Sequence, residues 1–147
     1  MLKQNLLIAA AVCSVLVALL HIYVIAQGPW AYRYFGAGEK LAGLAEQGSW
    51  IPTLLTSGIT LVFFVFAAYY FAGAGWLPKP PLFRIGLIGI AAIYTLRGAM
   101  VIPGWILGIK MSNFDIWSSI VSLSIGLLHC AAAWSYFGAP ALVEARG

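Results

Sequence analysis

The stretch LLIAAAVCSVLVALLHIYVIA, residues 6–26, carries no acidic or basic side chain apart from one histidine. As an α-helix it would extend about 31 Å at about 1.5 Å per residue, enough to cross a hydrocarbon core of about 30 Å. A cleaved signal peptide is the competing interpretation, because residues 24–26 resemble a small-residue cleavage site. The run is longer than a usual signal core, so we predict an uncleaved transmembrane helix.

Three further apolar runs follow, at residues 53–72, 85–102 and 116–137. Pro52 precedes the first of them, and proline is well tolerated at the start of a helix. The six tryptophans fall at or near the ends of the four runs, as expected at a membrane interface. The sequence therefore predicts an all-α integral membrane four-helix bundle with antiparallel neighbours, in which residues 1–147 form a single transmembrane domain.

The composition supports a lipid environment for most of the surface. The chain is 63% hydrophobic and 8% charged, whereas soluble domains carry about 25% charged residues. The net charge of +4 is not gathered in a basic cluster, so nucleic acid is not an expected partner. Cys13 and Cys130 lie inside apolar runs without a CxxC pair, and we predict no metal and no cofactor.

The first connection, residues 27–51, is the only long one between the runs. Within it, residues 38–47 predict a short amphipathic helix, with Leu41, Leu44 and Ala45 on one side. Such a segment is expected to lie on the membrane surface, as a connector or as a gate. Basic residues slightly favour the side that carries both termini, which predicts cytoplasmic termini.

Small and polar residues spaced by three and four mark one face of three runs, and helices in lipid pack through such faces. The first run offers Ala11, Ser14, Ala18 and His21; the second offers Thr53, Ser57, Thr60 and Ala67; the fourth offers Ser118, Ser122, Gly126, His129 and Ala133. Packing alone explains these stripes. For His129, a hydrogen bond between helices is the favoured interpretation over haem ligation.

Arg97 is the most informative residue, because a cation inside a span costs about 2.5–3.5 kcal/mol on insertion scales and needs polar company. Counting about 1.5 Å per residue from the midpoint of each run places several polar groups in the same half of the membrane. Tyr94 precedes Arg97 by one turn and shares its face. The predicted ligand-binding site comprises Arg97, His21, Tyr94, Ser57, Thr60 and Ser122.

Two interpretations of Arg97 remain open. In the first, its guanidinium pairs with Glu39, Glu46 or Asp115, caps carbonyls at a helix end, or extends towards the surface. In the second, it holds an anionic or carbonyl-bearing ligand that His21 and Tyr94 orient.

The chain resembles small four-span bacterial membrane proteins in general architecture. Small multidrug-resistance transporters use a carboxylate in their first span, which residues 6–26 lack. Quinone-coupled disulfide enzymes and vitamin K epoxide reductases need paired cysteines, and glutathione-linked four-span enzymes carry more charge in their helices. Walker, GxSxG, HExxH and glycine-rich dinucleotide motifs are also absent from the sequence.

These observations predict a non-enzymatic accessory subunit or an oligomeric membrane component, located in the bacterial inner membrane. Its expected partners are the lipid bilayer and either another membrane protein or further copies of the chain. The alternative is a carrier or binding protein for a small lipophilic or anionic molecule around Arg97 and His21. A membrane-embedded enzyme that uses the same residues is a third possibility.

Overall fold

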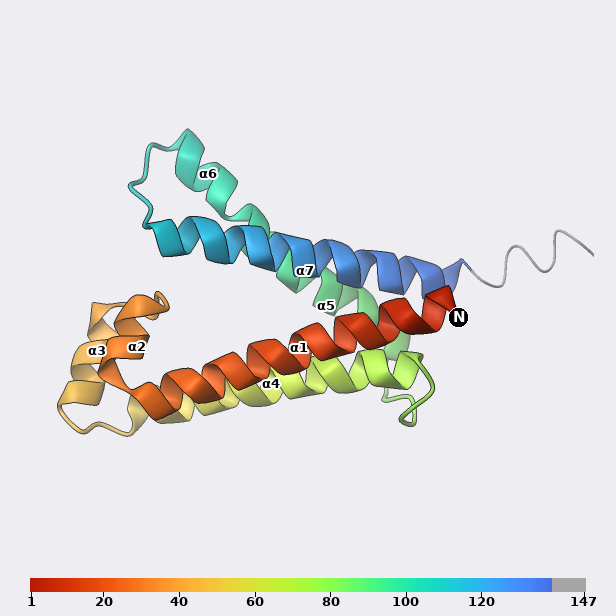
Figure 1. Ribbon diagram of the computed structural model, residues 1–147, viewed down its shortest axis with the longest axis horizontal. Coiled ribbons are helices and arrows are strands. Elements are labelled where there is room, and N and C mark those ends of the chain that lie inside the picture. The colour runs from red at the N-terminus through yellow and green to blue at the C-terminus, as the bar shows by residue number, and fades with distance from the viewer. Residues whose placement is uncertain (139–147) are drawn as a thin grey trace, which may run out of the picture.

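The computed structural model describes residues 1–138. Within that range the chain is helical and contains no strand. Figure 1 shows the helices in chain order: α1 (Leu2–Gln27), α2 (Pro29–Tyr34), α3 (Glu39–Glu46), α4 (Ile51–Gly73), α5 (Phe83–Ala99), α6 (Val101–Ile106) and α7 (Asn113–Phe137).

Four segments are long and apolar enough to cross a membrane: α1, α4, α5 together with α6, and α7. The predicted all-α four-helix bundle is therefore confirmed, as is the short helix in the first connection, which is α3. Large apolar side chains are exposed along all four segments, as lipid-facing helices require. The N-terminus and the end of α7 lie at the same end of the bundle, which we name the terminal end (Figure 1).

The third span differs from its predicted end at residue 102, because helical structure resumes after a break and continues to Ile106. α5 ends at Ala99, and α6 begins at Val101 with Pro103 in its first turn. Proline cannot donate the backbone hydrogen bond that would continue α5, but it is tolerated in the first turn of a new helix. The proline therefore interrupts this span instead of ending it.

The bundle is built from two helix pairs, α1 with α4 and α5 with α7. Two glycines allow α5 and α7 to approach closely. A Cβ atom at Gly98 would collide with the backbone of Leu123, and one at Gly126 would lie 2.6 Å from the backbone nitrogen of Thr95. Close contact at small residues is the usual basis of helix association in lipid. The two glycines therefore position α5, which carries Arg97, against α7.

The buried face of α4 differs from the predicted stripe. Thr60 and Ala67 are buried as expected, but Thr53 and Ser57 are exposed. Thr56 is buried instead, and its hydroxyl donates to the carbonyl of Pro52 at 2.8 Å. Successive residues of a helix are rotated by about 100° around its axis. A residue next to a buried one in the sequence therefore points away from the packed face. The prediction that Thr53 and Ser57 pack inward was wrong.

The first connection folds into a cap made of α2 and α3, of which α2 was not predicted. Arg33 holds the two helices together, because its guanidinium forms ion pairs with Glu39 at 2.6 Å and with Glu46 at 2.7 Å. The cap also touches the beginning of α7 in the other helix pair. There the rings of Phe35 and Phe114 pack edge to face, with their centroids 5.6 Å apart. Contact between the pairs is therefore made at this end by aromatic side chains.

A candidate binding site between the helix pairs

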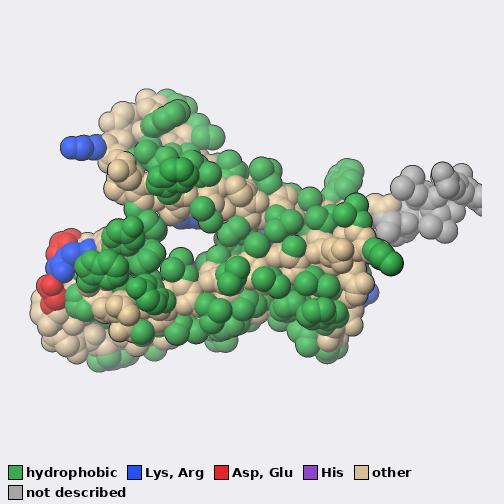
Figure 2. All heavy atoms as spheres, in the orientation of Figure 1, with side chains coloured by type: hydrophobic (Ala, Val, Ile, Leu, Met, Phe, Trp, Pro, Cys, Tyr) green, Lys and Arg blue, Asp and Glu red, His purple; other side chains and the backbone are tan. Residues whose placement is uncertain are grey.

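The two helix pairs separate towards the end of the bundle that carries the cap (Figure 1). In the space-filling view, a hollow remains between them, and basic atoms are visible in its wall (Figure 2). The Phe35–Phe114 contact bounds the hollow at the cap end. Towards the terminal end it is bounded by the level at which all four spans meet, around Tyr94 and His129. The hollow therefore opens sideways, where a bilayer would surround the protein.

Arg97 lies on α5 one turn beyond Tyr94, at the level where the pairs separate. Its guanidinium donates to the hydroxyls of Ser118 and Ser119 on α7, both at 3.3 Å. The residue is exposed, and the ion pairs found in residues 1–138 are those of Arg33. Two long hydrogen bonds to neutral hydroxyls satisfy only part of a group that has five N–H donors. Arg97 thus has polar neighbours but keeps donors for a further acceptor.

The carboxylates expected to pair with Arg97 are used elsewhere. Glu39 and Glu46 accept hydrogen bonds from Arg33, and these bonds lower the pKa of both carboxyl groups below its usual value. Asp115 forms a capping box with Ser112 at the start of α7, in which the Asp115 carboxylate accepts from the Ser112 hydroxyl at 2.7 Å. All three side chains are thereby held by nearer partners than Arg97.

His21 lies on the opposite wall, on the same face of α1 as the buried Ser14. The imidazole is only partly buried, because the pairs have separated at its level. Its Nδ1 lies 2.8 Å from the carbonyl oxygen of Val17, so this nitrogen must carry the hydrogen. In the neutral ring, Nε2 is then the free acceptor. The ring packs on Phe63 with centroids 4.9 Å apart, and Phe63 in turn contacts Tyr94.

A buried hydrogen-bond chain joins three spans beneath the hollow. The hydroxyl of Tyr94 donates to Ser14 Oγ at 3.1 Å, and Ser14 Oγ lies 3.1 Å from His129 Nε2. His129 Nδ1 is 2.8 Å from the carbonyl oxygen of Ile125 and must therefore donate. With a neutral imidazole, the polarity is then fixed: Tyr94 donates to Ser14, and Ser14 donates to His129. This chain is the hydrogen bond between helices that was expected for His129.

Tyr70 completes the packing around His129. The centroid of its ring lies 4.5 Å from that of the imidazole, and its hydroxyl donates to the carbonyl of Leu87 at 2.9 Å. No buried side-chain nitrogen or oxygen in residues 1–138 lacks a hydrogen-bond partner. The level around His129 is consequently a closed, satisfied core, unlike the level of Arg97.

The structure divides the six predicted site residues between the two helix pairs. Tyr94 and Arg97 lie on α5, and Ser122 on α7 donates to the backbone carbonyl of Tyr94 at 3.1 Å. On the other pair, Thr60 is buried and donates to the carbonyl of Thr56, whereas Ser57 is exposed. Phe63 stands between His21 and Tyr94, so those two residues do not contact each other directly.

Three site residues were not among the six: Ser14, Ser118 and Ser119. Ser14 and Ser118 belong to the predicted stripes, so periodicity had placed them on packed faces. Ser119 lies three residues before Ser122, so the same spacing could have identified it, but the predicted stripe began at Ser118. Its side chain is buried in the structure.

Comparisons with protein-family models, with curated proteins and with solved structures found no match to this chain. Within residues 1–138, no group of three His, Cys, Asp or Glu side chains is arranged to hold a metal ion. The chemistry of the hollow is therefore that of one guanidinium, one imidazole acceptor, several hydroxyls and apolar walls.

Proposed function

We propose that the protein binds a small amphipathic anion, as a binding protein or carrier, with the acidic group at Arg97 and the apolar part in the hollow. The observation that carries this proposal is the guanidinium inside the third span, whose hydrogen-bond partners among residues 1–138 are two serine hydroxyls. Charge-assisted hydrogen bonds to a carboxylate or phosphate are stronger than those to neutral hydroxyls. An anionic ligand would therefore offset the cost of placing Arg97 in the membrane.

The opposite wall fits the same ligand class. His21 Nε2 can accept a hydrogen from a hydroxyl or protonated acid, and Phe63 beside it offers an apolar surface. A molecule that has one acidic group and a hydrocarbon part would satisfy both walls at once. Long-chain fatty acids are the simplest members of this class and serve as the probe.

The test is equilibrium binding of a fluorescent long-chain fatty acid to the purified protein in nonionic detergent. Arg97→Ala and Arg97→Gln should weaken binding roughly 10- to 100-fold, the range expected for a lost charge-assisted hydrogen bond. Arg97→Lys should retain part of the affinity because it keeps the charge. Lys110→Ala, which removes a cation outside the spans, should bind like the unchanged protein.

Three results would contradict the proposal. The first is that the methyl ester of the fatty acid competes as well as the acid. The second is that Arg97→Gln binds the fatty acid unchanged while remaining folded by circular dichroism. The third is that Lys110→Ala loses as much affinity as Arg97→Gln. Each would show that the guanidinium does not recognise the acidic group.

The accessory subunit or oligomer expected from the sequence is the second candidate, and the sideways opening of the hollow favours it. A carboxylate on a helix of a partner, or of a second copy, would meet the same guanidinium. In that case the protein purifies in mild detergent with a fixed partner or as a defined oligomer, and Arg97→Gln dissociates it. A monomeric protein that binds the fatty acid argues against this candidate. An enzymatic role is the weakest candidate, since Phe63 separates His21 from Tyr94.

For the location, we propose the bacterial inner membrane with both termini in the cytoplasm. Support comes from the four spans and from the charges at the terminal end. Lys3, Lys79 and Arg84 lie there together with the amino group of the chain, against three basic residues at the cap end, Arg33, Lys40 and Lys110. An excess of Lys and Arg marks the cytoplasmic side of bacterial membrane proteins.

A further inference from the structure

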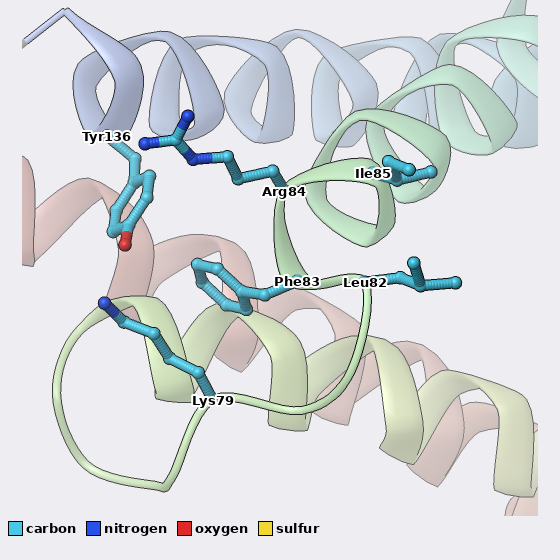
Figure 3. Close-up of a pocket in the computed structure, with 6 residues that line it drawn as sticks. All are labelled: Lys79, Leu82, Phe83, Arg84, Ile85 and Tyr136. Atoms are coloured by element: carbon cyan, nitrogen blue, oxygen red, sulfur yellow. The ribbon is translucent and has the colours of Figure 1, made fainter.

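A second site lies at the terminal end of the bundle, far along the chain and in space from the hollow. It is a surface pocket of about 530 Å³ lined by Lys79, Leu82, Phe83, Arg84, Ile85 and Tyr136 (Figure 3). These residues come from the connection between α4 and α5, from the first turn of α5 and from the end of α7. We name it the terminal pocket.

Cations gather around the aromatic side chains of this pocket. The Nζ atoms of Lys3 and Lys79 lie 4.5 and 5.5 Å from the centre of the Tyr136 ring. The guanidinium of Arg84 lies 6.0 Å from the ring centre of Phe137, the next residue along α7. The electrostatic attraction between a cation and the face of an aromatic ring offsets part of the repulsion that each cation experiences here. The rings do not neutralise the charges, and three like charges close together repel one another.

The carboxylates of residues 1–138 do not relieve this repulsion. Glu39 and Glu46 are in α3, and Asp115 is in the first turn of α7, at the opposite end of the molecule. The acidic atoms visible in Figure 2 accordingly lie at the cap end. An anion that bridges Lys79 and Arg84 would lower the electrostatic energy of the terminal pocket.

The pocket also has an apolar side. In Figure 3, Arg84, Lys79 and Tyr136 converge, whereas Leu82 and Ile85 point away from them. Leu82 and Ile85 are 74% and 66% exposed, which suits contact with acyl chains. Tyr136 and Phe137 stand at the last turn of a span, the depth at which aromatic residues meet lipid headgroups. A cationic part beside an apolar part matches a phosphate headgroup and its hydrocarbon chains.

We infer that the terminal pocket binds the phosphate of an anionic phospholipid in the leaflet that faces the termini. Lys79 and Arg84 contact the phosphate, Lys3 adds to the positive field, and Tyr136 holds the cations in place. Leu82 and Ile85 lie along the acyl chains. The site shares no residue with the hollow and does not depend on the function proposed for Arg97.

The experiment is native mass spectrometry of the full chain in nonionic detergent. Phosphatidylglycerol, phosphatidylcholine with the same chains and inorganic phosphate are the probes. Phosphatidylglycerol should bind more tightly than phosphatidylcholine. Lys79→Gln combined with Arg84→Gln should weaken phosphatidylglycerol binding roughly 30-fold, since each basic residue near an anionic lipid contributes about 1 kcal/mol.

Matched variants separate local recognition from net charge and from misfolding. Lys40→Gln with Lys110→Gln removes two charges at the cap end and should leave the affinity within about twofold. Lys79→Arg with Arg84→Lys keeps both charges and should bind phosphatidylglycerol, which shows that the fold tolerates changes at these positions. Arg97→Gln should also bind it normally, whatever its effect on the fatty acid.

Several outcomes would overturn the inference. Equal affinity for the two phospholipids would remove the role of charge, and an equal loss in the cap-end variant would remove the role of the pocket. Unchanged binding in Lys79→Gln with Arg84→Gln would do the same. If inorganic phosphate displaces the lipid at similar concentrations, the ligand is a free anion and not a phospholipid.

Discussion

At the scale of single residues, Ser14 is the central member of the hydrogen-bond chain between Tyr94 and His129. Its Oγ accepts from Tyr94 and donates to the neutral His129 ring, and all three side chains are buried. A serine hydroxyl is the smallest group that can do both. Replacing it leaves two buried polar atoms without partners, which is costlier than losing an exposed hydrogen bond.

Ser14→Ala should therefore lower the free energy of unfolding by about 1–2 kcal/mol. Tyr94→Phe combined with Ser14→Ala should cost less than the two single changes together, because the unpaired Tyr94 hydroxyl is then absent. Unfolding in mixed micelles of nonionic detergent and SDS measures both effects. Ser124→Ala is the control, since the Ser124 hydroxyl bonds within its own helix at an exposed position. An equally small effect of Ser14→Ala and Ser124→Ala would show that the hydrogen bonds of Ser14 do not stabilise the fold as predicted.

The sequence only partly predicted the hydrogen-bond chain formed by Tyr94, Ser14 and His129. Spacing identified Ser14 and His129 as members of packed faces, because a helical period of 3.6 residues needs no tertiary information. The pairing of Tyr94 with Ser14, and not with His21, depends on how far the helix pairs have separated at each level. The position of Phe63 between His21 and Tyr94 likewise follows from three-dimensional packing. Depth along a span cannot reveal either feature.

At the scale of helices, the α5–α7 pair depends on glycines that face the partner backbone. Gly98 and Gly126 face the backbone of Leu123 and of Thr95 respectively. Gly89 also lies in α5, but a Cβ atom there would meet nothing within 4 Å. The same helix thus contains one glycine in close contact with its partner helix and one beside which a methyl group has room, which provides a matched comparison.

Gly98→Ala should destabilise the protein by about 1–3 kcal/mol, because the added methyl group must push α5 away from α7. It should also weaken the contacts between Arg97 and the two serines of α7. Gly89→Ala should be neutral or stabilising by up to about 1 kcal/mol, since alanine is the better helix former. Thermal unfolding in detergent, followed by circular dichroism, compares the two. Similar effects of both substitutions would show that the helices are not in close contact at Gly98.

Helix existence was more predictable than helix continuity. Hydrophobic length alone identified four spans, because lipid requires each backbone segment to satisfy its hydrogen bonds internally. The break at Met100 and the resumption as α6 were missed, since Pro103 was interpreted as the end of the span. α2 was missed because a segment of six residues is too short to show a helical pattern of apolar residues.

At the scale of the whole molecule, the acidic side chains of residues 1–138 all lie at the cap end, whereas basic side chains lie at both ends. Leu82 and Leu107 report on these ends, because they lie in connections on opposite sides and are 74% and 72% exposed. Replacing either by cysteine leaves the charge pattern unchanged. In a background of Cys13→Ala and Cys130→Ala, Leu107→Cys should react with a membrane-impermeant maleimide in intact bacterial cells. Leu82→Cys should react only after the cells are opened, and the reverse pattern would contradict cytoplasmic termini.

The contact between Phe35 and Phe114 determines how a molecule would reach Arg97. Because this contact bounds the cap end and the packed core bounds the other, the remaining route runs laterally through the acyl chains. A ligand would first partition into the lipid and then diffuse in two dimensions. Its occupancy would consequently follow its mole fraction in the bilayer, and doubling the amount of lipid at fixed total ligand would dilute it and lower the bound fraction.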